Sequence, residues 1–184
     1  MHSRKEQFQW VSALNMVGGG GTSKGIFFKD VSSTGMPGSI TINLPGADLP
    51  ANMQNQNTFL FGIMNSVTNA KIKANSIGNN AFRNAWGIQY ESKTKIDVTT
   101  IGASAFYGCR NSKRIWLSKN VQTVQADAFY YSDDGTYSNK LYLYCELPSK
   151  PSGYDATFGQ YAYYSYTYTR TTYWGVSEAS FDAL

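Results

Sequence analysis

The feature that most constrains this chain is a short motif that recurs along its middle. Ile-Gly-Asn-Asn-Ala-Phe at residues 77–82 returns as Ile-Gly-Ala-Ser-Ala-Phe at residues 101–106 and as Val-Gln-Ala-Asp-Ala-Phe at residues 124–129. A looser fourth copy ends in Ala-Thr-Phe at residues 156–158. A unit of about 24 residues cannot enclose a hydrophobic core alone, so successive units must stack on one another. The repeat therefore predicts a solenoid of stacked coils.

The phenylalanine that closes each copy predicts a ladder of rings. Neighbouring parallel strands lie about 4.8 Å apart, so Phe82, Phe106 and Phe129 should stack in register, one above another. The alanine before each phenylalanine is expected to stay small because the next coil passes over it. Gly78 and Gly102 are expected to adopt a backbone angle that a side chain would disfavour.

The motif, followed by Tyr-Gly-Cys at residues 107–109 and Ile-Trp-Leu at residues 115–117, resembles the BspA-type leucine-rich repeat. The likeness covers roughly residues 59–160. It implies a right-handed solenoid with one short parallel strand per coil. It also implies a relation to surface proteins of bacteria and protists and to phage-encoded proteins.

The sequence departs from this family pattern in two places. A constant spacing aligns Ser92 and Thr94 with Ile115 and Leu117, so the inner wall is expected to be irregular there. Residues 1–58 show no repeat that aligns with the later copies.

The predicted fold class is mainly β with short helical or irregular segments: a leucine-rich-repeat-like solenoid with short parallel strands, an N-terminal helix and a Tyr-rich C-terminal cap. Residues 1–21 are expected to form the helix and a glycine linker that serve as a docking arm. Residues 22–58 form a β-containing segment, residues 59–160 the solenoid and residues 161–184 the cap. Pro-Gly pairs at residues 37–38 and 45–46 are expected to form turns around one strand.

The N-terminal helix is the predicted assembly contact, through Phe8, Trp10 and Leu14. Ser3 and Glu6 fit a capping box at its start, and the glycine run that follows suits a flexible tether. A helix packed on its own domain fits the same pattern, and the sequence does not separate the two.

Positive charge is concentrated in the repeats. Residues 71–119 hold nine lysines and arginines against two acidic residues, while the rest of the chain is net acidic. A basic face with Lys71, Lys95 and Arg114 could attract phosphates, acidic glycans or an acidic protein. The alternative is an ordinary solvated surface. Nucleic acid is not an expected partner because the sequence carries no nucleic-acid-binding motif.

Tyrosine is concentrated at the other end of the repeats, where twelve of the 14 tyrosines lie at or beyond residue 130. Tyrosine and tryptophan offer large contact area at low entropic cost. The candidate ligand-binding residues are Tyr164, Tyr166, Tyr168, Arg170, Tyr173 and Trp174. The same residues could instead cap the last apolar coil, because a solenoid needs a covered end.

The composition argues against an enzyme. The only histidine is His2, at a terminus, so no Ser-His or Cys-His catalytic pair can be written, and no catalytic residue, metal site or cofactor is predicted. Cys109 and Cys145 are interpreted as buried small residues at coil corners. No apolar run reaches the roughly 18 residues that a membrane span needs, so no membrane insertion is expected.

These features predict a non-enzymatic structural or binding protein. The first interpretation is a bacteriophage virion component, such as a tail, fibre or head-decoration protein, that acts in assembly or host attachment. It rests on a surface-type solenoid that starts at Met1 without an export signal. The alternative is a bacterial cell-surface adhesin module, located outside the cell, that binds glycans or host proteins. The expected partners are other virion or surface proteins, and a homo-oligomer is compatible with either class.

Overall fold

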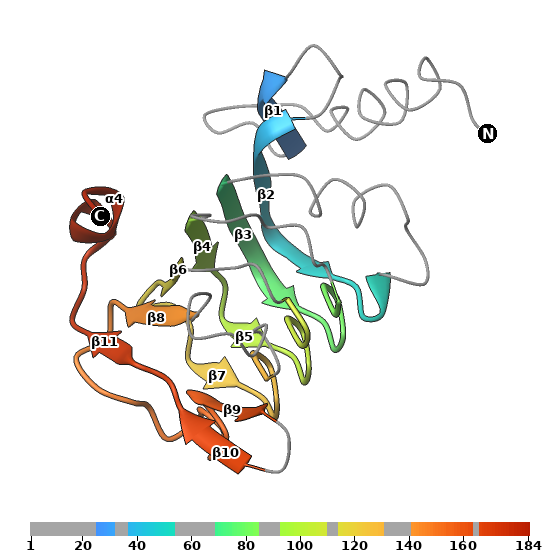
Figure 1. The fold of residues 1–184 in the computed structure, drawn as a ribbon. Helices are drawn as coiled ribbons and strands as arrows, with labels where there is room; N and C mark the ends of the chain where they lie inside the picture. The colour runs from blue at the N-terminus through green and yellow to red at the C-terminus, as the bar shows by residue number, and fades with distance from the viewer. Residues whose placement is uncertain are drawn as a thin grey trace.

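The computed structural model describes residues 25–31, 37–53, 69–84, 93–109, 114–130, 141–163 and 166–184. Strands dominate this part of the chain, and one short helix lies near its end (Figure 1). The elements are β1 (Gly25–Val31), β2 (Pro37–Leu49), β3 (Asn69–Ile77), β4 (Lys93–Asp97), β5 (Thr100–Ile101), β6 (Arg114–Leu117), β7 (Thr123–Val124), β8 (Tyr142–Cys145), β9 (Gln160–Tyr163), β10 (Tyr166–Thr169), β11 (Thr172–Trp174) and α4 (Glu178–Asp182). The predicted N-terminal helix lies outside the described residues.

The strands stack into a solenoid. Strands β2, β3, β4, β6, β8 and β11 lie side by side in parallel, and β1 adds an antiparallel strand at the β2 edge. The short strands β5 and β7 continue the sheet from the far end of β3. Figure 1 shows the successive coils displaced by one strand each. The predicted fold class, a mainly β solenoid with parallel strands, is confirmed.

Alternation of buried and outward residues along β3, β4 and β8 explains why the sheet forms. In β3, Ala70 and Ile72 are buried while Lys71 and Lys73 face outward. Parallel register then places buried residues of successive strands above one another, which removes a continuous apolar row from water. This inner row is made of Ile42, Ile72, Ile96, Leu117 and Cys145, each at most 1% exposed.

The predicted phenylalanine ladder is confirmed. The ring centroids of Phe82 and Phe106 lie 5.2 Å apart, and those of Phe106 and Phe129 lie 5.4 Å apart, both pairs stacked. The backbone supports this register, because the Phe82 N–H donates to the Ala105 carbonyl at 2.7 Å. Phe158 meets Phe129 edge-on at 6.3 Å, so the looser fourth copy ends the stack.

The glycines of the motif are needed for a different reason than predicted. Neither Gly78 nor Gly102 has a positive φ, so the expected backbone angle is wrong. A Cβ atom on Gly78 would lie 2.5 Å from the Ala51 nitrogen of the neighbouring coil, and one on Gly102 would lie 2.6 Å from the Asn79 nitrogen. Close approach of two backbones therefore selects glycine here.

The left-handed backbone angle falls two residues after the glycine position. Asn80, Ser104 and Asp127 have φ values of 55°, 53° and 56°. Asparagine and aspartate tolerate this region better than most residues because their short side chains bond locally. The bend of each coil is thus made by a small polar residue.

The inner wall is continuous where irregularity was expected. Thr94 pairs with Ile115 and Ile96 pairs with Leu117, two residues away from the alignment that constant spacing gives. The third coil has two more residues between its strand and its turn than the second, and this insertion shifts the register. Thr94 is fully buried in the wall. Ser92 lies outside the described residues.

The solenoid begins earlier than the sequence indicated. β2 pairs in parallel with β3, and the Gly78 N–H donates to the Leu49 carbonyl at 2.8 Å. Asn52 has a φ of 55°, as Asn80 does, and accepts a side-chain hydrogen bond from Asn80 at 3.0 Å. Residues 37–53 therefore form a further coil. The prediction that residues 1–58 contain no copy of the repeat is wrong for this segment.

The predicted strands at residues 26–31 and 39–44 are confirmed within β1 and β2. The predicted turns are wrong, because Pro37 starts β2 and Pro45-Gly46 lies inside that strand. The pair sits where the register shifts between Leu44 and Asp48. A bulge thus takes the place of a turn.

Candidate functional site

The outward side of the parallel sheet carries a row of large side chains that changes in character across the sheet. We call it the outward stripe; its members, paired strand to strand, are Lys71, Lys95, Trp116, Tyr144 and Tyr173. On β3, β4, β6 and β8 each member lies one residue away from a buried residue of its strand, and on β11 Tyr173 lies next to Trp174, which packs against the core. The pleat that builds the core therefore also builds the stripe. The stripe is basic on β3 and β4 and aromatic on β6, β8 and β11.

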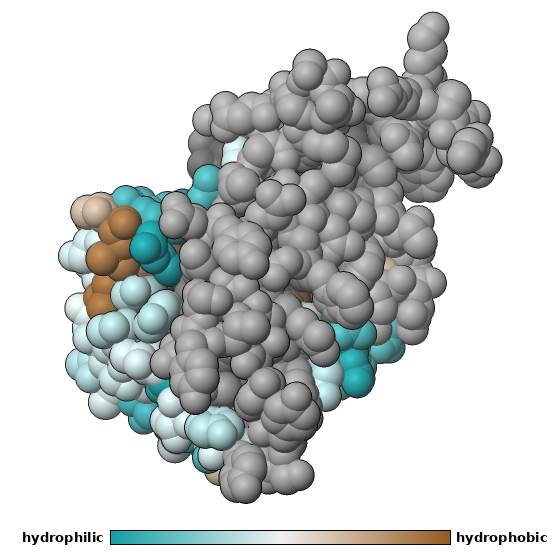
Figure 2. Space-filling view, viewed as in Figure 1, coloured by the Kyte–Doolittle hydropathy of each residue, from teal (hydrophilic) through white to brown (hydrophobic). Residues whose placement is uncertain are grey.

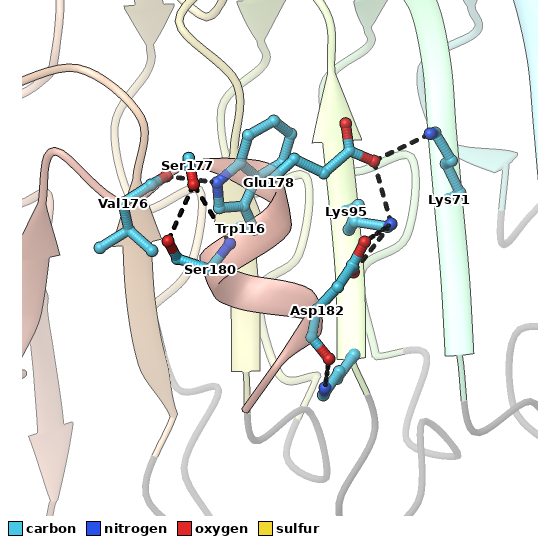
Figure 3. A network of polar contacts seen from close by, with 9 residues as sticks. Lys71, Lys95, Trp116, Val176, Ser177, Glu178, Ser180 and Asp182 are labelled. Carbon is cyan, nitrogen blue, oxygen red and sulfur yellow. Dashed lines mark hydrogen bonds and ion pairs between the residues drawn. The ribbon is translucent and has the colours of Figure 1, made fainter.

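Helix α4 lies across this stripe (Figure 3). The Glu178 carboxylate is 2.9 Å from the ammonium groups of both Lys71 and Lys95. The Asp182 carboxylate is 2.9 Å from the Lys95 ammonium. Two carboxylates one helical turn apart thus face lysines on adjacent strands.

One aromatic side chain anchors the helix. Phe181 is fully buried and packs edge-on against Tyr144, with ring centroids 5.3 Å apart. The Lys93 ammonium lies 5.9 Å from the centre of the Phe181 ring and donates to the Asp182 carbonyl at 2.8 Å. Apolar burial and cationic contact therefore act on the same turn of α4.

The segment around α4 is also tied to the stripe. The Trp116 indole N–H donates to the Val176 carbonyl at 2.8 Å, just before the helix. The Arg114 guanidinium donates to the main-chain oxygen of Leu184 at 3.2 Å, just after it. In the space-filling view the surface near α4 includes an apolar patch (Figure 2), and Leu184 is 53% exposed.

The ion pairs shift the protonation of their members. Hydrogen bonds from Lys95 and Lys71 hold the pKa of the Glu178 carboxyl below its ordinary value. Partial burial of the Lys95 ammonium acts to lower its pKa, but hydrogen bonds to Asp182 and Glu178 outweigh this, so the pKa is raised. Both shifts favour the charged forms that hold α4 in place.

A pocket of about 230 Å³ opens beside α4. Its lining includes Lys73, Lys95, Trp116, Lys119, Glu146 and Glu178. Lys73 lies 3.9 Å from the Asp97 carboxylate. The pocket therefore extends the charged end of the stripe.

Sequence reasoning missed α4 and its two carboxylates, because residues 161–184 were interpreted as a Tyr-rich cap. The signal was present: Ser177 caps the helix by accepting from the Ser180 N–H at 3.1 Å, and Glu178 follows in the first turn. Serine at the N-cap and an acidic residue next to it are typical of a helix start.

The structure brings the predicted basic face together. Lys71 and Lys95 are paired neighbours on β3 and β4, and Arg114 lies on the next strand. All three contact residues 178–184 of the same chain. In the described chain the cationic groups of this face therefore point at its own C-terminal segment.

The predicted aromatic set is divided among several places. Tyr166 and Tyr168 lie on β10, which pairs with β9 in a separate sheet, whereas Tyr173 and Trp174 lie on β11 in the main sheet. Tyr173 faces outward and stacks on Tyr144 at 4.8 Å, while Trp174 packs against the core.

The remaining predicted residues lie away from the stripe or beyond description. Arg170 is 6% exposed and donates to the Gln160 carbonyl at 3.2 Å. Tyr164 lies outside the described residues, as does the predicted assembly contact of Phe8, Trp10 and Leu14.

The two cysteines are buried as predicted, but the predicted place at a coil corner is wrong for Cys145, which lies on β8 in the inner row. Cys109 and Cys145 are free and buried. Burial raises the pKa of the Cys145 thiol to about 12, which suppresses the reactive thiolate. Across the residues with described positions, no group of three or more metal-binding side chains occurs. In the same residues, no helix is both long and apolar enough to cross a membrane.

Comparison with known proteins gives one match. The family model described as BspA type Leucine rich repeat region (6 copies) matches residues 40–139, more than half of the chain. The match starts within β2, where the structure places the additional coil. No curated protein and no solved structure matches.

Proposed function

The chain belongs to the BspA-type leucine-rich repeat family, and from that premise we propose that its outward stripe is the contact surface of a non-enzymatic binding protein. Solenoids of this family are typically non-enzymatic, and their repeats generally serve protein binding or surface adhesion. The proposal adds the location of the binding surface and the absence of catalysis.

The observation that carries the proposal is the register of the stripe. Trp116, Tyr144 and Tyr173 stand in register on three neighbouring strands, beside the lysines of β3 and β4. Tyr173 is 42% exposed, whereas Trp116 is buried and Tyr144 packs against Phe181 of α4. Aromatic side chains held on a fixed backbone lose little entropy on binding and supply much of the energy of protein interfaces. Adjacent positive charge speeds the approach of an acidic partner.

Two exposed tyrosines provide a matched test. Tyr173 lies in the stripe and Tyr168 lies on β10 in the separate sheet, and each is 42% exposed. We expect Tyr173→Ala to weaken binding of the labelled chain to whole bacterial cells about tenfold, which corresponds to about 1.4 kcal/mol. Tyr168→Ala should leave binding unchanged. Equal losses, or a loss with Tyr168→Ala alone, would place the contact surface elsewhere.

The location of the protein is a separate part of the proposal. We propose the bacteriophage particle, with the bacterial cell surface as the alternative, because the sequence resembles repeats found in both settings. Mass spectrometry of purified particles and of cell-surface fractions should detect the chain in the particles. Its recovery from cell surfaces alone would favour the adhesin.

A further inference from the structure

We propose that α4 occupies the binding site of a partner: the outward stripe recognises an acidic segment of another protein that carries one aromatic anchor, and α4 must leave before that segment binds. The inference rests on the proposed function and names the chemistry of its partner. α4 itself defines the ligand, with carboxylates at Glu178 and Asp182 and the anchor at Phe181 between them.

The helix depends on the stripe for its existence. It has five residues, and isolated helices shorter than about 12 residues are marginal in water. Its fold is therefore held by contacts with the sheet. A short segment held in this way can be replaced by another that makes the same contacts.

The contacts are of a kind that a competitor can replace. The carboxylates of the ion pairs are exposed, with Glu178 41% and Asp182 52% exposed, while the Lys95 side chain is 21% exposed, so water and salt screen the pairs from the carboxylate side. Only Phe181 is fully buried in α4. The docked position of α4 therefore depends on one buried side chain and on ion pairs that solvent screens. A longer acidic segment can compete with α4 for this site.

Gly175 and Val176, which connect β11 to α4, allow the helix to leave without disturbing the sheet. Gly175 has a φ of 74° and open space where a Cβ would stand. The Gly175 and Val176 N–H groups donate to the Leu147 and Cys145 carbonyls, at 2.9 and 3.0 Å. The chain is thus fixed up to Val176, and residues 177–184 can swing away from that point.

The pocket beside α4 carries lysines that the ion pairs of α4 do not use. Lys73 and Lys119 line it together with Lys95, and the Asp97 and Glu146 carboxylates line it as well. Lys73 already lies 3.9 Å from Asp97, and the ion pairs of α4 within the described chain run to Lys71 and Lys95. A partner segment longer than α4 would therefore meet Lys119 in addition to the lysines that α4 contacts.

The test uses the full chain with the triple change Glu178→Gln, Phe181→Ala and Asp182→Asn, which releases α4. The probe is a fluorescein-labelled peptide of residues 177–184, followed by fluorescence anisotropy. We expect the release variant to bind the peptide at least tenfold more tightly than the wild type, whose site is filled. A peptide with alanine in place of the phenylalanine should bind at least tenfold more weakly.

Two controls keep the outcome decisive. Lys71→Gln with Lys95→Gln, added to the release variant, should reduce peptide binding at least tenfold. If the triple change impairs folding, Glu178→Lys with Asp182→Lys retains the aromatic anchor and should release α4 by charge repulsion. The inference would be overturned if the folded release variant does not bind the peptide, or if the wild type binds the peptide as tightly as the release variant does.

Other occupants would be recognised in the same experiment. A release variant that binds an acidic polysaccharide but not the peptide would overturn the assignment of a protein segment. A wild-type dimer, detected by analytical ultracentrifugation and lost in the release variant, would overturn it in favour of helix exchange between copies. If the release variant does not bind the peptide but Tyr173→Ala still weakens cell binding, this inference is wrong and the proposed function is still supported.

Discussion

The inward and outward faces of the same strands follow different rules. The inner row stays apolar and buried from β2 to β8, whereas the outward stripe, one residue away, changes from lysine to tryptophan to tyrosine. An inward residue must fit its counterpart on the next coil, about 4.8 Å away. An outward residue has only to fit what lies over it, and here that is α4.

This contrast separates the information for folding from the information for binding. Repetition specifies the coil because every rung presents the same packing problem. The outward residues do not repeat, and this difference between strands makes the surface specific. The stripe is basic at its β3 end and aromatic at its β11 end, so a partner can bind it in one orientation. The non-repeating outward residues are therefore where the function of this solenoid is to be sought.

The largest effect is expected from breaking the inward side. Phe106 is fully buried between Phe82 and Phe129, so Phe106→Ala should lower the free energy of unfolding by about 3–5 kcal/mol. Chemical denaturation measures it. Tyr168→Ala, on an exposed ring, should cost less than about 1 kcal/mol. Comparable losses would mean that the ring stack does not hold the coils together.

A smaller loss is expected where two coils touch through glycine. A Cβ at Gly102 would lie 2.6 Å from the Asn79 nitrogen, so Gly102→Ala should destabilise the fold by about 1–3 kcal/mol. The matched control is Gln125→Ala, at the equivalent position of the next coil, where a Cβ is already present.

Gln125→Ala removes one acceptor of the Ala103 N–H, which also donates to the Asn79 side chain at 2.9 Å. The control should therefore cost less than about 1 kcal/mol. If the two variants melt at the same temperature, close approach is not what selects glycine in this motif.

A gain in stability is expected at Thr94, a polar residue of the inner wall. The Thr94 hydroxyl is buried and has no hydrogen-bond partner within the described part of the chain. Replacing it by a methyl group of the same shape removes a desolvated polar atom. Thr94→Val should raise the free energy of unfolding by about 1 kcal/mol, measured by denaturation. A loss would show that the hydroxyl has a role that packing does not reveal.

The same contrast explains what the sequence could and could not predict. The phenylalanine ladder was predictable because three intact copies repeat one packing solution. The coil at residues 37–53 was not, because Leu49 to Met53 keeps the left-handed Asn52 but neither the glycine nor the phenylalanine of the motif. The third coil has a two-residue insertion after β6, so the constant spacing of the motif does not predict the pairing of Thr94 with Ile115.

The stripe was predictable only in part. Lys71, Lys95 and Arg114 could be grouped as a basic face because residues 71–119 concentrate the positive charge of the chain. What covers them could not be read from the repeat, because α4 lies about 80 residues further along the chain than Lys95. Contacts between distant, non-repeating segments leave no periodic signal in a single sequence.

The smallest effect, and the one that tests the outward side directly, is the pH dependence of α4 docking. The pKa of Glu178 is lowered from 4.5, so its contribution is present above that pH and is lost as pH falls through the lower folded value. The pKa of Lys95 is raised from 10.5, so its contribution is present below that pH and is lost as pH rises through the higher folded value. Docking should therefore be tightest between about pH 5 and 10.

The Trp116 indole N–H reports this docking by NMR because it donates to the Val176 carbonyl. Its signal should shift toward a solvent-exposed position below pH 4.5 and in high salt, with a change of at most about 1 kcal/mol because the pairs are exposed. Glu178→Gln should remove most of the acid response and leave the alkaline response of Lys95 to Asp182. An unchanged signal down to pH 3 would mean that the ion pairs are not needed for docking, and that Phe181 together with the main-chain contacts of Lys93, Trp116 and Arg114 holds the helix.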